Sequence, residues 1–354
     1  MRDDSRPVRT GEELDTTKLG AFMRERLGVS GEVAVRQFAG GHSNLTYLVQ
    51  VGEREVVLRR PPHGAAAKGG HDMPREYRIL EALAPTDVPV AKPVALCEDA
   101  AVLGAPFYLM ERVVGVVLRD AGTVTALTDA TSMRAVAESF VGTLARIHAV
   151  KSPALAALGK GEGYCARQVK GWTERYAKAR TDDIADMNAI AEWMPARIPS
   201  TEEAAFIHND FKYDNLMLAP RRLHDVVAVL DWEMATVGDP LLDLGTSLGY
   251  WTDPDDAPEL RALSLSPTLA PGGMTRLELA QRYQEVSGRR VGDMVFAYVL
   301  ALFKIATIAQ QIYARYALGH TKDPRFAALG GAVRVLASQA RRAMAANRIH
   351  GLAP

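Results

Sequence analysis

Two carboxylates and one amide occur close together in the sequence, with a spacing that suits phosphate chemistry. Asp210 precedes Asn215 by five residues in the segment HNDFKYDNLML, and Asp231 follows an apolar run in the segment VVAVLDWE. A carboxylate and an amide oxygen are hard ligands of the kind that Mg²⁺ prefers. A second carboxylate beside a metal–phosphate site can accept the proton of a substrate hydroxyl. These groups are the minimum equipment for phosphoryl transfer, in which positioning and charge neutralisation supply most of the catalysis.

The elements around these residues must bring the side chains together. The runs 216–218 and 226–230 have the apolar composition of two short strands. If the strands pair as an antiparallel hairpin, Asn215 before the first and Asp231 after the second lie side by side at its open end. Asp210 lies on the loop that leads in and can face the same space. Each acidic or amide residue alone would more often cap a turn, so the prediction depends on the joint pattern.

The joint pattern resembles that of the aminoglycoside and choline phosphotransferase superfamily, which has a protein-kinase-like fold. HNDFKYDN is similar to the catalytic loop of the family, and Asp231-Trp232-Glu233 stands where protein kinases have Asp-Phe-Gly. More narrowly, the sequence resembles the kinase-like domains associated with acyl-CoA dehydrogenases. The shared segments span most of the chain in the expected order: LRRPP (58–62), HDMPREYRIL (71–80), FYLMERVVG (107–115), LARIHAV (144–150) and LDWEMATVGDPLLDLG (230–245).

This resemblance implies a small-molecule kinase that uses ATP and Mg²⁺, and it gives a role to each matching residue. Asp210 is then the catalytic base, and Asn215 and Asp231 are the metal ligands. Lys212 is placed like the lysine of Ser/Thr protein kinases and would neutralise the γ-phosphate; an exposed lysine is the equal alternative. His208 is expected to orient the loop by hydrogen bonding rather than to act chemically.

A Gly-Gly turn stands between two expected strands in AGGHSNLTYLV (39–49). The backbone N–H groups of Gly40 and Gly41 can approach phosphates, and Ser43 or Asn44 can add a donor. Such a turn alone is weak support, because hairpins use it for steric reasons. The chain has no Walker A pattern, so the sequence does not indicate a P-loop enzyme.

Arg59 stands at the position of the strand-three lysine of kinases, and Glu76 in the following helix can pair with it. Arginine keeps the positive charge and can bind phosphate through two N–H groups, but it is not a neutral replacement for lysine. Arginine here resembles the acyl-CoA-dehydrogenase-linked subgroup, so inactivity does not follow. Strand alternation puts Arg60 on the opposite face. The alternative for the Arg59–Glu76 pair is a surface salt bridge of little energetic value.

The connection between the two expected lobes is the segment around Met110, Glu111 and Val113. The resemblance implies that the backbone of these residues meets the adenine of the nucleotide. An ordinary interlobe connection is the alternative, because no side chain in the segment identifies the contact.

Three further polar residues are predicted to be structural. Asp239 precedes Pro240 and is typical of a helix N-cap with proline at the first helical position. With Asp243 it would brace the metal loop. His148 ends a helix with an apolar face, so we expect a buried core histidine there.

Apolar periodicity and the resemblance together predict an α+β fold with two lobes, of the protein-kinase-like type. A helical pattern is followed by strands, a helix and another strand, and then by mainly helical segments. The expected N-terminal helix is 11–28, the strands are 33–38, 45–51, 55–59 and 107–110, and the helices are 75–83, 132–149, 165–180, 276–287, 294–318 and 325–347. We assign a nucleotide-binding β-rich lobe with an N-terminal helix to residues 1–112. A helical catalytic and acceptor-binding lobe covers 113–354.

Composition excludes some classes of function. The chain has 354 residues with 42 Lys+Arg and 42 Asp+Glu, so its net charge is zero. Nucleic-acid binders usually carry a basic excess, and we therefore expect no nucleic-acid partner. The two cysteines, Cys97 and Cys165, are far apart and indicate free thiols rather than a disulfide framework.

No membrane partner is expected either. The N-terminus MRDDSRPVRT lacks the apolar run of a signal peptide. The most apolar stretch, 294–318, is interrupted by Lys304 and other polar residues, which favours a buried helix over a membrane span. The sequence thus predicts a cytoplasmic protein, and it leaves monomer and homodimer both open.

The phosphate acceptor is the least determined part of the prediction. The acidic segment WTDPDDAPEL (251–260) can face a polycation such as an aminoglycoside, although charge runs are usually solvated loops. The helix 165–180 is basic, and Trp172 and Tyr176 alternate with its cations, which suits an anionic acceptor such as a CoA thioester. A solvated face is the alternative. The basic residues are Arg167, Lys170, Arg175, Lys178 and Arg180.

The subgroup resemblance favours a hydroxyacyl or hydroxyacyl-CoA acceptor over an antibiotic. Two alternatives remain within the same fold: an aminoglycoside O-phosphotransferase, and a catalytically inactive nucleotide-binding pseudokinase, which Arg59 suggests. A helical binding protein without a nucleotide would leave the ordered motifs unexplained. The sequence does not separate ATP from GTP.

Overall fold

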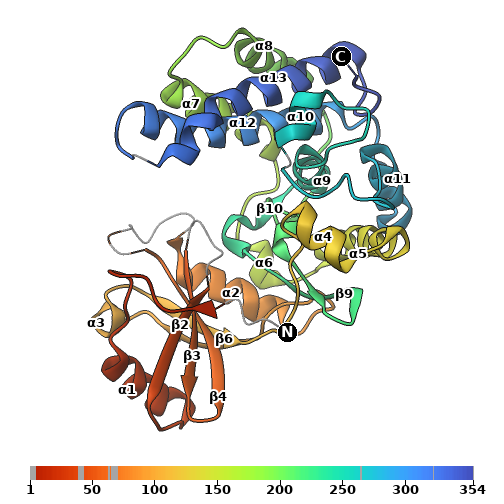
Figure 1. Cartoon of the computed structure of the whole chain (residues 1–354). Helices are drawn as coiled ribbons and strands as arrows, with labels where there is room; N and C mark the ends of the chain where they lie inside the picture. The colour runs from red at the N-terminus through yellow and green to blue at the C-terminus, as the bar shows by residue number, and fades with distance from the viewer. Residues whose placement is uncertain are drawn as a thin grey trace. The chain divides into compact units, whose positions relative to one another are not determined.

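The computed structural model describes residues 5–38, 44–62, 64, 71–263, 265–321 and 323–353. The chain divides into two compact units (Figure 1). Unit 1 comprises Met1–Gly115 together with the short returning segment Val227–Met234, and unit 2 comprises Val116–Val226 and Ala235–Pro354. Asp231 therefore belongs to unit 1, whereas Asp210 and Asn215 belong to unit 2.

Unit 1 is built on an antiparallel sheet of six strands in the order β1-β2-β3-β4-β6-β5. The strands are β1 (Ser5–Arg6), β2 (Val33–Phe38), β3 (Leu45–Val51), β4 (Arg54–Arg60), β5 (Pro93–Cys97) and β6 (Phe107–Glu111). The predicted strands at 33–38 and 45–51 are confirmed, and the other two are one residue longer at one or both ends. β4 lies inside the sheet, where Arg59 pairs with Thr46 of β3 and Tyr108 of β6. This register fixes the backbone of Arg59 on both sides.

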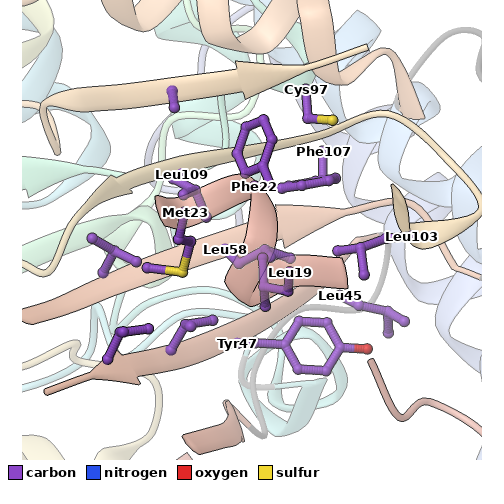
Figure 2. Close-up of a cluster of buried hydrophobic side chains, with 14 residues drawn as sticks. Leu19, Phe22, Met23, Leu45, Tyr47, Leu58, Cys97, Leu103, Phe107 and Leu109 are labelled. Atoms are coloured by element: carbon purple, nitrogen blue, oxygen red, sulfur yellow. The ribbon is translucent and has the colours of Figure 1, made fainter. Parts of the chain in front are cut away.

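Helix α1 (Thr16–Leu27) covers one face of this sheet. Its buried residues Leu19, Phe22 and Met23 follow the three- and four-residue spacing of one helical face. Figure 2 shows them against side chains of the strands, among them Leu58 and Phe107. The expected start at residue 11 is wrong, because the side chain of Asp15 accepts a hydrogen bond from the Lys18 N–H and caps the helix there. The predicted stop at residue 28 is confirmed by a left-handed glycine, with φ of 65°.

Helix α2 (Met73–Leu83) is capped by Asp72, and its first residue lies two positions before the predicted start. Its buried face contains Met73, Glu76, Ile79 and Leu83. Because Glu76 stands at helical spacing from these apolar residues, its carboxylate is carried into the interior of unit 1. The short helix α3 (Ala100–Leu103) completes the helices of this unit.

Unit 2 is mainly helical. Its helices are α4 (Ala121–Leu127), α5 (Ala130–Ala149), α6 (Pro153–Ala156), α7 (Tyr164–Ala179), α8 (Ala185–Trp193), α9 (Pro240–Gly249), α10 (Pro258–Leu263), α11 (Arg276–Ser287), α12 (Val295–Ala317) and α13 (Leu329–Ala346). The predicted helices at 132–149, 165–180, 276–287 and 294–318 correspond to α5, α7, α11 and α12. The predicted helix 325–347 divides into a 3-10 turn, Pro324–Ala328, and α13.

Helix α12 is the central helix of unit 2. It packs against α13, which runs beside it in blue in Figure 1, and against α7 and α9. Gly245 of α9 makes the contact with α12 close, because a Cβ atom there would lie 2.7 Å from the Cβ of Ala297. By length and composition α12 is the one helix in the described part of the chain that could cross a bilayer. Its most apolar window is 72% buried within the protein, as in a core helix.

Two small two-stranded sheets carry the loops with the candidate residues. β8 (Leu216–Ala219) pairs with β9 (Arg222–Val229), and only two residues separate the strands, so the predicted hairpin is confirmed. β7 (Ala205–Ile207) pairs antiparallel with β10 (Thr236–Gly238). The loop that holds Asp210 runs from the end of β7 to the start of β8.

Candidate active site

The loop between β7 and β8 brings Asp210, Lys212 and Asn215 together. The amide nitrogen of Asn215 donates to the backbone oxygen of Asp210 at 2.8 Å and to its Oδ2 at 3.2 Å. The Lys212 ammonium lies 3.0 Å from the same Oδ2. A 3-10 turn at Tyr213–Asn215 closes the loop, since the Asn215 N–H donates to the Lys212 carbonyl. The predicted base therefore has a cation and an amide within hydrogen-bond distance.

Tyr250, at the end of α9, also contacts the Asp210 carboxylate. Burial raises the pKa of the Tyr250 hydroxyl well above its usual value, and Asp210 raises it further through its charge and a hydrogen bond. The hydroxyl thus stays protonated and acts as a donor. The Lys212 ammonium lies over the Tyr250 ring, 4.5 Å from its centre. These contacts fix the positions of both Asp210 and Lys212.

Asp243 of α9 holds the start of the β7–β8 loop. Its carboxylate accepts the backbone N–H groups of His208 and Asn209, each at 2.7 Å. Its Oδ2 also lies 3.0 Å from Nε2 of His148, whose other ring nitrogen is 2.6 Å from the Tyr283 hydroxyl. Burial alone would raise the pKa of Asp243, but the hydrogen bonds and charges of the two histidines lower it overall. The structural roles predicted for Asp243 and for a buried His148 are thereby confirmed.

The other predictions for this loop agree with its contacts. The Asp210 N–H donates to Nδ1 of His208 at 3.3 Å, so the histidine orients the loop by hydrogen bonding. Asp239 caps α9 by accepting the Leu241 N–H at 2.7 Å, and Pro240 occupies the first helical position. The side chains of His208 and Asp239 therefore both accept backbone N–H groups and so position the chain.

Asn209 is held from the other side by two residues that the sequence analysis did not assign to the site. It adopts a left-handed backbone with φ of 69°. Lys304 of α12 donates to the Asn209 carbonyl at 2.6 Å, and the Asn209 amide donates to the Tyr164 hydroxyl of α7 at 2.9 Å. The only sequence signal for Lys304 is that it interrupts an apolar helix. A buried lysine in such a position requires polar partners, which the loop supplies.

In unit 1, Arg59 lies at the centre of a cluster of carboxylates. Its guanidinium is 3.1 Å from Glu76, 2.6 Å from Asp231 and 3.7 Å from Glu233. The side chains of Arg59 and Glu76 are only 12% and 4% exposed, so their pair is not a surface salt bridge. Burial lowers the pKa of Arg59, but Glu76 and the other acidic neighbours outweigh it and raise that pKa overall. Burial raises the pKa of Glu76, against the opposing charge of Arg59.

Arg60 lies on the opposite face of β4, as strand alternation predicts. It is buried and borders a cavity of about 380 Å³ that Glu13, Asp15 and Lys18 also line. Arg59 instead contacts α2 through Glu76. Of the two arginines, Arg59 is therefore the one beside Asp231.

Asp231 occupies a constrained turn two residues after the end of β9. Its φ is 63°, a left-handed conformation that few non-glycine residues adopt. The next residue, Trp232, is buried and donates its indole N–H to the Val229 carbonyl at 3.0 Å, which anchors the turn. Oδ1 of Asp231 accepts from Arg59. The carboxylate is 32% exposed, so its second oxygen can reach a ligand.

Glu233 is a further member of the cluster that the sequence analysis did not assign. Its Oε2 accepts from the Asn44 amide at 2.9 Å, and its backbone oxygen accepts from Arg75 at 3.3 Å. The amide oxygen of Asn44 lies 2.8 Å from Nδ1 of His71. Asn44 was predicted to donate a hydrogen bond to a phosphate. In the structure its amide nitrogen donates to Glu233. The other residues predicted in that turn, Gly40, Gly41 and Ser43, lie outside the described residues.

The predicted linker residues lie at the end of β6. Met110 pairs with Val57 in the sheet, and Glu111 donates its N–H to the Lys92 carbonyl at 2.8 Å. That N–H group is already used within unit 1. An adenine contact in this segment would therefore need other backbone groups, such as those of the half-buried Val113.

The residues present are compatible with magnesium ligands. Both hydrogen bonds of the Asn215 side chain use the amide nitrogen, which leaves its oxygen for a metal, and Asp231 has one carboxylate oxygen beyond its Arg59 contact. Among the described residues, no group of three His, Cys, Asp or Glu could hold a metal by itself. Magnesium in phosphoryl-transfer sites usually takes few protein ligands and completes its shell with phosphates and water.

The acidic segment 251–260 is only partly solvated: Asp255 and Glu259 are exposed, whereas Asp253 and Asp256 are buried. Asp256 forms a two-bonded pair with the Arg276 guanidinium, with both N–O distances 2.6 Å, and Asp253 lies 3.3 Å from the same group. All three side chains are almost fully buried. Burial raises the pKa of Asp253 to about 6, although the charge of Arg276 opposes this shift. These two carboxylates are therefore not offered to a polycationic ligand.

The basic helix predicted at 165–180 is α7, and its two aromatic residues face inward. Trp172 and Tyr176 are 6% and 3% exposed. Arg175 lies over the Trp172 ring at 4.6 Å, Arg167 donates to carbonyl groups of the preceding loop, and Arg180 lies just beyond the helix as its C-cap. The two aromatic residues are therefore not part of an exposed surface that could bind an anionic acceptor.

Solved structures with the same fold include phosphotransferases. A protein from Ralstonia eutropha, described as an aminoglycoside phosphotransferase, is 33% identical, covers 92% of this chain with 96% of its own, and has a TM-score of 0.79. The aminoglycoside phosphotransferase APH(4)-Ia in complex with AMP-PNP and hygromycin B covers 91% of the chain with 98% of its own at 17% identity, with a TM-score of 0.57. The latter shows the fold alone, and the predicted kinase-like fold is confirmed.

Curated relatives are longer proteins. Acyl-CoA dehydrogenase family member 11 from Homo sapiens is 34% identical over 321 residues, and family member 10 from Mus musculus is 33% identical over 325 residues. These matches cover 88% and 90% of this chain but only 40% and 30% of the relatives. The sequence profile described as the phosphotransferase enzyme family matches residues 34–279, which include the Arg59 cluster and the whole β7–β8 loop. With this match over most of the chain, the protein belongs to the phosphotransferase enzyme family.

Proposed function

We propose that this protein transfers the γ-phosphoryl group of Mg·ATP to a hydroxyl group of a small hydroxyacyl compound. The observation that carries the proposal is the catalytic loop, in which Asp210 contacts Lys212 at 3.0 Å and Asn215 at 3.2 Å. A carboxylate, a cation and a metal-binding amide are thus arranged on one loop of a phosphotransferase.

In the proposed reaction Asp210 accepts the proton of the acceptor hydroxyl. The hydroxyl oxygen forms a new bond to the γ-phosphorus, the bond from that phosphorus to the β-phosphate oxygen breaks, and ADP leaves with those electrons. Lys212 neutralises charge on the transferred group. Asn215 and Asp231 supply oxygen ligands to Mg²⁺, which offsets phosphate charge when it is bound.

The nucleotide is assigned to the Arg59 cluster of unit 1. Arg59 keeps the charge of the kinase lysine and holds both Glu76 and Asp231. Related folds have been solved with AMP-PNP and with ADP, and one, an aminoglycoside 2'-phosphotransferase-IIIa, with GDP. These ligands support a purine nucleotide, and we propose ATP.

Two observations support a hydroxyacyl acceptor. The relatives with 33–34% identity are named as acyl-CoA dehydrogenase family members, and this chain matches less than half of each. In addition, Asp253 and Asp256 are buried against Arg276 and do not form an acidic surface for a polycation. We therefore propose an acceptor without net positive charge.

An aminoglycoside acceptor is the second candidate, because the Ralstonia eutropha protein at 33% identity carries that description. The two candidates make opposite demands on charge. An aminoglycoside is a polycation and needs exposed carboxylates, whereas a hydroxy acid or its CoA thioester is an anion.

A direct phosphorylation screen tests the proposal. The purified chain would be incubated with Mg·ATP and, separately, hydroxy acids, their CoA thioesters and kanamycin, and mass spectrometry would detect the gain of one phosphoryl group. We expect gain on hydroxyacyl compounds only. Gain on kanamycin alone would establish the second candidate and reject the first.

The variant Asp210→Asn separates an active kinase from a nucleotide-binding scaffold. We expect turnover to fall by about 100-fold or more, as for loss of a general base, with similar affinity for Mg·ATP. Asp225→Asn is the matched control, since Asp225 is a partly exposed carboxylate of β9 paired with Arg222. If the wild-type chain binds Mg·ATP but phosphorylates nothing, and Asp210→Asn does not alter slow ATP hydrolysis, the chain is a scaffold.

A further inference from the structure

A small cavity lies within unit 2, beside the catalytic loop. Its volume is about 20 Å³, and Asn209, the residue before Asp210, forms part of its wall. Helices α7, α9 and α12 supply the rest of the lining, including Tyr164, Gln168, Trp172, Thr246 and Lys304. A cavity of this size holds about one water molecule. It therefore suits a single polar group at the end of a larger molecule.

Lys304 brings a buried positive charge to this cavity. The residue is 6% exposed, and its ammonium donates to two neutral oxygens, the carbonyl and side-chain oxygens of Asn209, at 2.6 and 3.4 Å. Within the described ranges no carboxylate lies within 4 Å of it. Burial lowers the pKa of Lys304, and the charges of Asp210 and Asp243 only partly oppose this. A buried ammonium without an anion is costly, so an anionic ligand would stabilise it.

The carboxylates whose charges act on Lys304 are Asp210 and Asp243. Asp243 already accepts two backbone N–H groups and faces His148, and Asp210 is paired with Lys212. Neither carboxylate therefore forms an ion pair with Lys304.

We propose that Lys304 binds the carboxylate of the acceptor, which is a free hydroxy acid, with one carboxylate oxygen in the cavity beside Trp172. The proposal rests on the proposed function and names the acceptor more narrowly. Asn209 links the two ends of the site, because Lys304 contacts it and Asp210 follows it in the chain. The charge of Asp210 also acts on Lys304, and in the proposed complex the carboxylate of a short hydroxy acid lies on Lys304 and its hydroxyl on Asp210. The indole of Trp172 supplies an apolar wall for the carbon chain.

The test compares acids with uncharged analogues. For the regioisomers of hydroxybutanoate and their methyl esters, kcat/KM would be measured on the wild-type chain, on Lys304→Met and on Lys304→Arg. We expect the wild type to prefer the acid by roughly 100-fold, as for a charge-assisted contact. Lys304→Met should lose this preference mainly through KM, and Lys304→Arg should keep part of it. Arg315→Met is the matched control, since Arg315 is an exposed cation on the same helix.

Because Lys304 also holds Asn209, a second readout separates acceptor binding from loop support. Calorimetric binding of hydroxybutanoate without nucleotide should be lost in Lys304→Met and kept in Arg315→Met. Acid and ester turnover that fall equally in Lys304→Met would overturn the proposal in favour of loop support alone. A wild-type preference for CoA thioesters over free acids would also overturn it.

The two proposals fail in different ways. If the wild-type chain phosphorylates none of the compounds, the proposed function fails, and calorimetry still decides the role of Lys304. Binding that depends on Lys304 would then support a carboxylate site without transfer. Absence of binding would overturn this inference also.

Discussion

The Arg59 guanidinium contacts Asp231 more closely than it contacts Glu76, the residue with which a kinase lysine would pair: the distances are 2.6 and 3.1 Å. One arginine therefore connects a buried helix carboxylate to the candidate metal ligand. A lysine has a single ammonium at its tip, whereas the guanidinium has donors that can point to two carboxylates at once. This geometry gives a structural reason for arginine at position 59.

Replacing Arg59 should affect stability and nucleotide binding together. In Arg59→Met, Glu76 stays buried without its cation, and we expect a loss of about 3–5 kcal/mol in the free energy of unfolding. Arg59→Lys should keep much of the stability but weaken Mg·ATP binding by about 10-fold, since one donor direction is lost. Chemical denaturation and calorimetry would measure the two effects.

The matched control for Arg59 is Arg112→Met, which removes a more exposed pair, Arg112–Glu55, also at 2.6 Å in unit 1. A partly exposed pair should contribute only about 0–1 kcal/mol. Equal stability of Arg59→Met and Arg112→Met, with unchanged nucleotide affinity, would contradict the role given to Arg59.

Asp243→Asn should destabilise the β7–β8 loop, which carries Asp210, without changing the Arg59 cluster of unit 1. The new amide can accept only through its oxygen, so one of the two backbone N–H groups or His148 loses its acceptor. We expect a loss of roughly 2–4 kcal/mol in the free energy of unfolding and a fall in kcat. The affinity for Mg·ATP, measured by calorimetry below the unfolding temperature, should remain similar. A variant as stable and as active as the wild type would show that the loop has other sufficient support.

Gly245 and Gly142 offer a paired test of helix packing. A Cβ at Gly245 would lie 2.7–2.8 Å from the Cβ and backbone atoms of Ala297, so Gly245→Ala should destabilise by about 1–3 kcal/mol. Gly142 lies inside α5 and has open space around its Cβ position, so Gly142→Ala should stabilise by up to about 1 kcal/mol. Thermal denaturation of both variants would compare them. The same sign of effect for both would argue against close packing of α9 on α12.

The raised pKa of Asp253 predicts a specific dependence of stability on pH. The group has a pKa of about 6 in the folded protein and 3.8 ordinarily, so between these values the folded state binds more protons than the unfolded state. Its contribution to stability is therefore full below the ordinary pKa and is lost as pH rises through about 6. The change amounts to roughly 3 kcal/mol. Asp253→Asn should flatten this part of the curve in denaturation experiments at several pH values, and an unchanged slope would assign it to other groups.

Local patterns in the sequence were enough to predict much of the fold. The strands around Arg59, the hairpin after Asn215 and the core helix α12 all follow from apolar periodicity, which reflects a buried face directly. Boundaries were less certain because caps decide them: α1 starts after Asp15 and not at residue 11. The missed helices α3, α4, α6, α8 and α10 are short, and a few turns give little periodic signal.

The candidate site was predicted where its residues share one loop or where the resemblance supplied the pairing, as for Arg59 and Glu76. Asp210, Lys212 and Asn215 share one loop and could be recognised together. His148 and Asp243, in contrast, are 95 residues apart, and Lys304 is 95 residues from Asn209. Burial of Asp253 likewise depends on Arg276, which lies beyond the acidic segment. Such pairings are set by tertiary packing, so a single sequence does not specify them.

Asn209 and Asp231 share a left-handed backbone, with φ of 69° and 63°. Glycine adopts this conformation freely, Asn and Asp tolerate it, and other residues meet a penalty of about 1–2 kcal/mol. A mutation of Asp231 to glycine would therefore remove the carboxylate while relieving the main chain. A single substitution of Asp231 by glycine would thus remove activity and still leave a well-folded protein. Only an activity measurement would distinguish that protein from the active one.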